Sequence, residues 1–68
     1  MKIEFSEDDT QILNGLADGA KIAELGKYLD TFWTPWELRR GVEILRGKLG
    51  ARTCAQAVAI ALREGVIK

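Results

Sequence analysis

Apolar residues recur along the chain at helical spacing, and capping signals divide this pattern into four segments. In the first segment, Ser6 is followed three residues later by Asp9, a pair whose side chains can satisfy free backbone N–H groups at a helix start. The apolar residues that follow lie on one face, at Ile12, Leu13 and Leu16. We therefore predict a helix that begins near Glu7 and ends at the glycine of residues 17–19.

The third segment has the strongest start signal in the chain. Thr34 suits the N-cap, Pro35 the first helical position and Glu37 the third, which completes a capping box. Apolar residues then repeat at spacings of four, three and four, which predicts a buried stripe formed by Leu38, Val42, Leu45 and Leu49. Gly41 and Gly47 interrupt this helix, and each costs about 1 kcal/mol relative to alanine unless something must approach closely.

Two further helices are predicted on either side of the third segment. The apolar stripe of Ile22, Leu25 and Leu29 predicts a short helix before it. Another begins at a second capping box, Thr53 with Gln56, and ends at Gly65, with an inner side formed by Ala57, Val58, Ala61 and Leu62. No alternation of period two is long enough for a strand. The pattern predicts an all-α fold of four short helices, and residues 1–68 as a single domain.

The residue types present argue against catalysis and metal binding. The chain has 68 residues, no histidine and one cysteine, so it allows no internal disulfide. A zinc site would have to be built from one thiolate and carboxylates, and no base stands beside a candidate nucleophile. We expect no enzymatic activity and no cofactor.

The distribution of charge and hydropathy restricts location and partners. No apolar run approaches the ~20 residues that span a bilayer, and the amino end is acidic, so we expect a cytoplasmic protein without membrane contact. The net charge is zero, but residues 1–34 carry three basic against seven acidic side chains, and residues 35–68 carry seven against three. A basic half is the feature that attracts phosphate, although solvated helix faces account for such charges as well.

The carboxyl half has a recognisable motif, ILRGKLGARTCAQAVAIALREGVI at residues 44–67. It resembles the end of the LuxR-type (GerE-type) helix-turn-helix domain, in which K-L-G, a polar turn with threonine, A-V and a final glycine–hydrophobic–isoleucine recur. The amino half is similar at Phe5-Ser6, Ile12-Leu13, residues 17–19, Leu25-Gly26 and Leu29. The resemblance covers residues 5–67.

The resemblance implies a tri-helical core plus a C-terminal dimerisation helix, with the third helix in the major groove of DNA. Glu37, Leu38 and Arg39 stand at the family's T-V-K/R positions, and Lys48 is its K-L-G lysine. Arg39 is then the best-matched DNA contact. Arg40 is not a basic position of the family, but from the next position it can reach the DNA backbone. The candidate DNA-binding residues are Arg39, Arg40, Leu38, Lys48 and Arg46.

The chain departs from the family pattern around the start of the third helix. Residues 30–33 lengthen the turn by about two residues, Glu37 replaces a threonine, Gly41 replaces a histidine, and Ile44 stands at a polar position. The lengthened turn can alter the angle between the second and third helices. An acidic side chain in the recognition helix would repel phosphate, so these departures weaken the expectation of DNA contacts.

Three aromatic residues cluster at the same place, and two interpretations of them stay open. Phe32, Trp33 and Trp36 either close the core around the lengthened turn or, with Ile44, form a protein-interaction surface rimmed by arginines. The last helix carries the small residues Cys54, Ala55 and Ala59. They permit close contact with the same helix of a second copy, but ordinary core packing or solvent exposure explains them as well.

Two functions follow from these interpretations. The favoured one is a stand-alone transcription regulator that binds duplex DNA through the third helix. The alternative is a degenerate helix-turn-helix module that binds RNA polymerase, a sigma factor or another regulator, and modulates transcription without reading bases.

Overall fold

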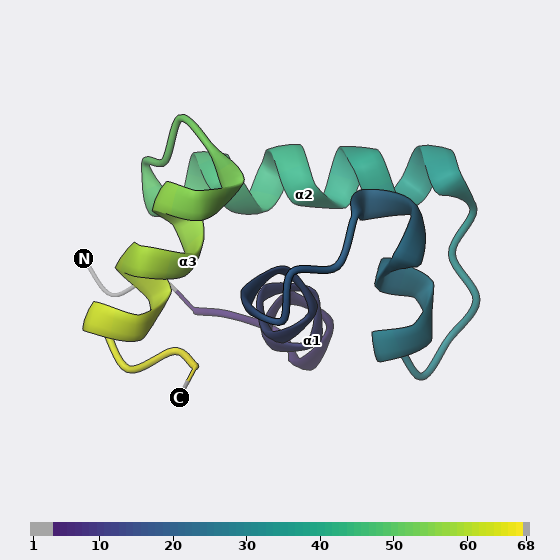
Figure 1. Ribbon diagram of the computed structural model, residues 1–68, viewed down its shortest axis with the longest axis horizontal. Coiled ribbons are helices and arrows are strands. Elements are labelled where there is room, and N and C mark those ends of the chain that lie inside the picture. The colour runs from purple at the N-terminus through teal and green to yellow at the C-terminus, as the bar shows by residue number, and fades with distance from the viewer. Residues whose placement is uncertain (1–3, 68) are drawn as a thin grey trace.

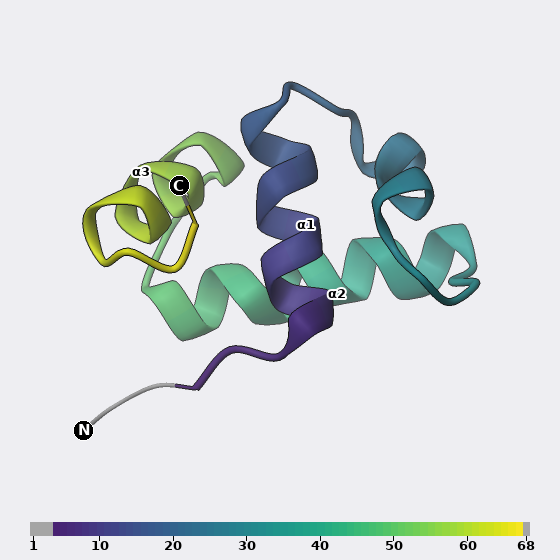
Figure 2. The same ribbon diagram turned by 90° about the horizontal axis from the view of Figure 1, so that it is seen from below.

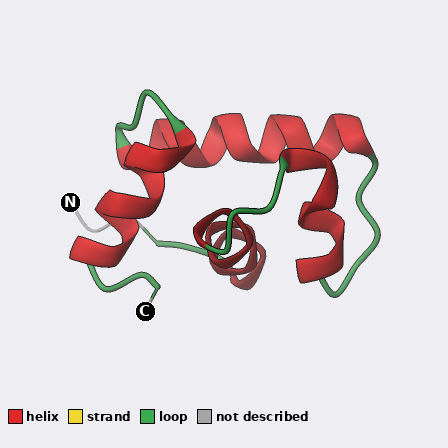
Figure 3. Cartoon of the chain, viewed as in Figure 1, coloured by secondary structure: helices red, strands yellow, loops and turns green. Residues whose placement is uncertain are grey.

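The computed structural model describes residues 4–67, which contain four helices joined by loops (Figures 1 and 3). They are α1 (Glu7–Ala17), the 3₁₀ helix η1 (Ile22–Tyr28), α2 (Pro35–Leu49) and α3 (Cys54–Arg63). No strand occurs within this range, which confirms the predicted all-α class. None of these helices combines the length and the apolar composition needed to cross a bilayer.

The longest helix, α2, runs along one side of the molecule, and the other three pack beneath it (Figure 1). In Figure 2, where α1 is seen from the side, it lies between η1 and α3. Contacts join α1 and α2 to each other and to both remaining helices, whereas η1 and α3 make none with each other within residues 4–67. The core therefore lies among all four helices, and its buried residues are Ile12, Leu13, Leu25, Leu29, Leu38, Val42, Leu45, Ala57, Ala61 and Ile67.

The helix starts agree with the capping signals at two positions of three. The Ser6 hydroxyl accepts from the backbone N–H of Asp9, and the Asp9 carboxylate accepts from that of Ser6, both at 3.1 Å. Thr34 and Glu37 make the same reciprocal pair. At α3 only half of the predicted box forms, because the Gln56 side chain accepts from the backbone N–H of Arg52 instead of Thr53.

The predicted inner side of α3 is wrong at one position. Ala57 and Ala61 are buried and Val58 is half-buried, but Leu62 is 48% exposed. Successive residues in an α-helix are about 100° apart, so Leu62 lies well away from the line of Ala57 and Ala61. The ten residues of α3 therefore cover the core with a narrower face than the sequence indicated.

The lengthened turn before α2 is held by a contact between Trp33 and Gly41. A Cβ atom at Gly41 would lie 2.7 Å from Cζ3 of the Trp33 ring and 3.6 Å from Cδ1 of Ile12. The indole N–H donates to the Thr31 hydroxyl at 3.2 Å, and the half-buried ring packs against the core. The ring therefore occupies the space beside α2 that a side chain at position 41 would need.

Because the ring fills this space, the two helical glycines should respond oppositely to alanine. At Gly41 the added methyl group meets the ring, so we expect Gly41→Ala to lower the free energy of unfolding by about 1–2 kcal/mol. At Gly47, where a Cβ meets nothing within 4 Å, we expect Gly47→Ala to raise it by up to about 1 kcal/mol. Urea denaturation of both variants measures the difference.

Removal of the ring supplies the control. Trp33→Ala should cost about 2 kcal/mol, less than a fully buried aromatic residue, because the ring is only half-buried. In that background Gly41→Ala should become stabilising, because the obstacle is gone and the helix propensity of alanine remains. If the changes in free energy of unfolding caused by the two substitutions were additive, the proposed contact between the ring and position 41 would be contradicted.

Candidate functional site

The face of α2 that points away from the core is a surface that the other helices leave uncovered. Leu38, Val42 and Leu45 are buried on the inner side, and in Figure 1 no other element lies over the opposite side along most of the helix. That outer side is exposed at Trp36, Arg39, Arg40, Glu43, Ile44 and Gly47. These residues, named here the α2 outer face, combine two arginines, one acid and two large apolar side chains.

Only part of the predicted DNA-binding set is available on this face. Arg39 and Arg40 are exposed, and within residues 4–67 neither makes a side-chain hydrogen bond or an ion pair. Two nearby arginines with free donors can clamp a phosphate or pair with guanine. The α2 outer face therefore keeps two basic side chains of the five residues predicted to bind DNA.

The other two basic residues make intramolecular contacts, although Lys48 itself remains exposed. Lys48 Nζ lies 2.9 Å from a carboxylate oxygen of Asp9 and 6.0 Å from the centre of the Phe5 ring. Arg46 is half-buried, and its Nη1 donates to the backbone carbonyl of Arg52 at 3.0 Å. Lys48 thus joins the C-terminal end of α2 to the start of α1, and Arg46 braces the turn that leads to α3.

Leu38 requires a correction. The resemblance placed it among the DNA contacts, whereas the apolar spacing placed it in the buried stripe. It is only 3% exposed and belongs to the core. Its side chain packs in the core rather than facing solvent, so it cannot contact a base from this position.

The aromatic cluster divides into one packing residue and two surface residues. Phe32 is 87% exposed and Trp36 69%, and Ile44 further along α2 is 53% exposed. Trp33, in contrast, packs on Gly41 and on the core. Trp33 therefore supports the turn, and a role as an interaction anchor stays a prediction for this half-buried residue as it does for Phe32, Trp36 and Ile44. The interior glycine at position 41 was the sequence signal for this contact.

Glu37 is held by the cap of α2. Its carboxylate accepts from the backbone N–H of Thr34 at 2.8 Å, and its own N–H donates to the Thr34 hydroxyl at 3.2 Å. The hydrogen bond from the Thr34 backbone, and next that involving the Thr34 side chain, lowers the pKa of Glu37 below the ordinary value of 4.5. Its negative charge thus lies at the N-terminus of α2, where the helix dipole favours it.

This cap predicts a pH dependence of stability that Glu37→Gln should remove. A lowered pKa means that the charged cap contributes stability above pH 4.5, the ordinary value, and loses it as the pH falls through the lower pKa of the folded state. We expect the wild type to exceed Glu37→Gln in free energy of unfolding at neutral pH. The two should converge in acid, because glutamine keeps the hydrogen bond but carries no charge. Urea titrations at several pH values measure this, and a constant difference would contradict it.

The predicted dimer residues of α3 do not share one environment. Cys54 is half-buried and packs against the core, whereas Ala55 and Ala59 are exposed. The exposed Leu62 lies on the same side as these two alanines, since it follows them at helical spacing. Cys54 therefore packs on the core, and whether Cys54, Ala55 and Ala59 contact another chain stays a prediction.

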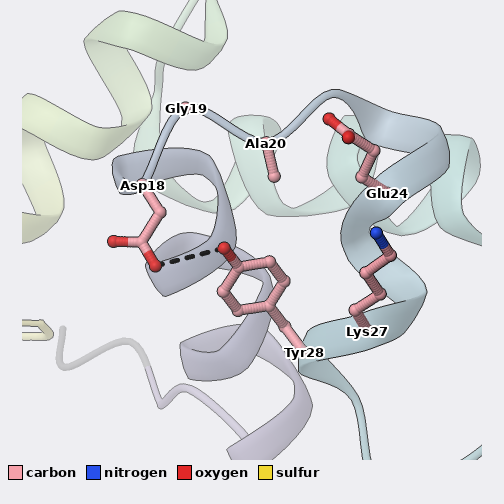
Figure 4. Close-up of a pocket in the computed structure, with 6 residues that line it drawn as sticks. All are labelled: Asp18, Gly19, Ala20, Glu24, Lys27 and Tyr28. Carbon is pink, nitrogen blue, oxygen red and sulfur yellow. Dashed lines mark hydrogen bonds between the residues drawn. The ribbon is translucent and has the colours of Figure 1, made fainter.

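A shallow polar pocket of about 280 Å³ lies between the end of α1 and η1 (Figure 4). Its lining residues are Asp18, Gly19, Ala20, Glu24, Lys27 and Tyr28. The Tyr28 hydroxyl donates to the Asp18 carboxylate at 3.1 Å. Partial burial, and next this carboxylate, raise the pKa of Tyr28. The sequence carried no signal for this pair, because it joins residues of two different helices.

Neither the pocket nor the rest of the described chain forms a metal centre. Within residues 4–67, no three cysteine or carboxylate side chains are grouped so that they could hold a metal ion. The pocket is open and is lined by two acids and a lysine. Its Tyr28 and Asp18 side chains are already hydrogen-bonded to each other. The α2 outer face is therefore the better candidate site.

Comparisons of the chain with family models, with curated proteins and with solved structures found no match. The resemblance to LuxR-type helix-turn-helix domains rests on the sequence motifs alone and stays a prediction.

Proposed function

We propose that this chain is a small transcription regulator that binds duplex DNA through the α2 outer face. The observation that supports it best is the pair Arg39 and Arg40, exposed and without partners within residues 4–67, on a helix face that no other element covers along most of its length. The major groove of B-DNA is wide enough to admit such a helix, and arginine is the side chain that most often reads guanine there.

The contact set is narrower than the resemblance implied. Leu38 faces the core, Lys48 pairs with Asp9, and Arg46 binds the Arg52 carbonyl. Arg39 and Arg40 are left to supply the positive charge of the proposed interface, with Trp36 and Glu43 beside them. Binding is then expected to be weaker and less dependent on salt than that of a domain with a large basic surface.

The salt dependence of binding tests this proposal. Each phosphate contact adds about 0.9 to the slope of log affinity against log salt, so Arg39→Ala with Arg40→Ala should lower the slope by up to about 2. Arg63→Ala is the matched control, because Arg63 is exposed on α3 and lies outside the α2 outer face. Fluorescence anisotropy on a bacterial promoter library at low salt provides the measurement. Absence of any binding there would overturn the proposal.

A second candidate function is supported by a different observation on the same face. Phe32, Trp36 and Ile44 expose large apolar surfaces, and Glu43 offsets part of the arginine charge. Tryptophan and arginine are enriched among the residues that dominate protein interfaces. The alternative is therefore a module that binds RNA polymerase, a sigma factor or another regulator without reading bases.

Trp36 discriminates between these functions better than Trp33, because its exposed ring contributes little to the fold. Trp36→Ala should change the free energy of unfolding by no more than about 0.5 kcal/mol and should abolish capture of a protein partner. Pull-downs from bacterial lysate with and without nuclease make the measurement, and circular dichroism checks the fold. Capture that survives nuclease but is unaffected by Trp36→Ala would count against the protein-binding alternative.

A further inference from the structure

Four residues of the α2 outer face follow a spacing that is the same from either end of the helix. Trp36, Arg40, Glu43 and Gly47 are separated by four, three and four residues. At 3.6 residues per turn they lie within an arc of about 60°, and all four are exposed. An antiparallel copy of α2 laid on this face therefore brings position 36 opposite position 47, and position 40 opposite position 43.

The side chains at these positions are complementary in that arrangement. The largest one, Trp36, meets the residue without a side chain, Gly47, and the cationic Arg40 meets the anionic Glu43. A twofold axis repeats each contact, so one pair of helices makes two indole–glycine contacts and two ion pairs. The same residues in a parallel arrangement would put like charges opposite each other, which is unfavourable.

No contact within the described part of the molecule explains why position 47 is a glycine. A Cβ there would meet nothing within 4 Å, whereas the ring of Trp33 accounts for Gly41. An interior helical glycine costs about 1 kcal/mol relative to alanine, and close approach of another chain is a reason for its presence. The glycine lies on the exposed side of α2, where an external group has access.

Arg40 and Glu43 are also unpaired within residues 4–67, although they lie three positions apart on one helix. The single ion pair among these residues is that of Lys48 with Asp9. On the four-residue stripe, one positive and one negative charge give a net charge of zero. A balanced stripe of this kind complements itself, whereas DNA or an acidic protein would find only Arg40 attractive.

We propose that the chain forms an antiparallel homodimer through the α2 outer face, with Trp36 on Gly47 and Arg40 on Glu43 of the second copy. The dimer covers the surface proposed to bind DNA, so dimerisation and DNA binding exclude each other. Self-association at high concentration then withdraws the protein from DNA. The dimer rests on its own observations, and it is measured without DNA.

Charge reversal tests the pairing. Arg40→Glu and Glu43→Arg each place like charges opposite each other twice, so each variant alone should raise the dimer dissociation constant at least about tenfold. The double variant should restore dimerisation. An equimolar mixture of the two single variants should form a 1:1 heterodimer, because the acidic stripe of one variant then meets the basic stripe of the other. Analytical ultracentrifugation without DNA measures all four samples.

Two further variants separate this interface from other ways to dimerise. Gly47→Leu fills the space that receives the indole and should also weaken the dimer, while its better helix propensity keeps the fold intact. Arg63→Glu is the matched control on α3 and should leave dimerisation unchanged. A wild type that stays monomeric at the highest attainable concentration would overturn the proposal. So would a dimer that Arg40→Glu does not weaken, which would point to another face such as α3.

Discussion

The rest of the structure depends on the burial of the apolar stripe of α2. Leu38, Val42 and Leu45 run along the helix and are buried against α1, η1 and α3. Each fully buried side chain of this kind contributes roughly 1.5–3 kcal/mol, which is large for a domain of this size. Because η1 and α3 do not contact each other within residues 4–67, α2 and α1 connect them. The helical period then turns the opposite side of α2 outward along most of its length.

Trp33 links this core to the surface chemistry. Its ring packs on Gly41 and holds the turn of residues 30–33 against α2. The chain then enters α2 through the Thr34 cap, and Phe32 and Trp36, which flank this region, point into solvent. One aromatic residue of the cluster therefore supports the turn, and the other two are left for a partner. The aromatic cluster is a structural feature and a candidate binding feature at the same time.

Internal contacts also determine which charges remain for a partner. Lys48 joins Asp9 at the N-terminal end of α1, and Arg46 binds the carbonyl of Arg52 in the next turn. The basic half of the chain is thus less basic toward a ligand than its composition indicates. Arg39, Arg40 and Glu43 remain exposed on α2. The proposed DNA binding uses the two arginines. The proposed self-association uses Arg40 together with Glu43.

The sequence alone determined where α1 and α2 begin and the inward stripe of α2, because caps and apolar spacing are local properties of the chain. It could not determine how Trp33, Lys48 and Leu62 are placed. The first two depend on contacts with Gly41 and Asp9, which lie on other elements or far along the chain, and Leu62 depends on how much of α3 the core covers. Only the tertiary structure settled these positions, since burial and pairing of a side chain depend on its neighbours in space.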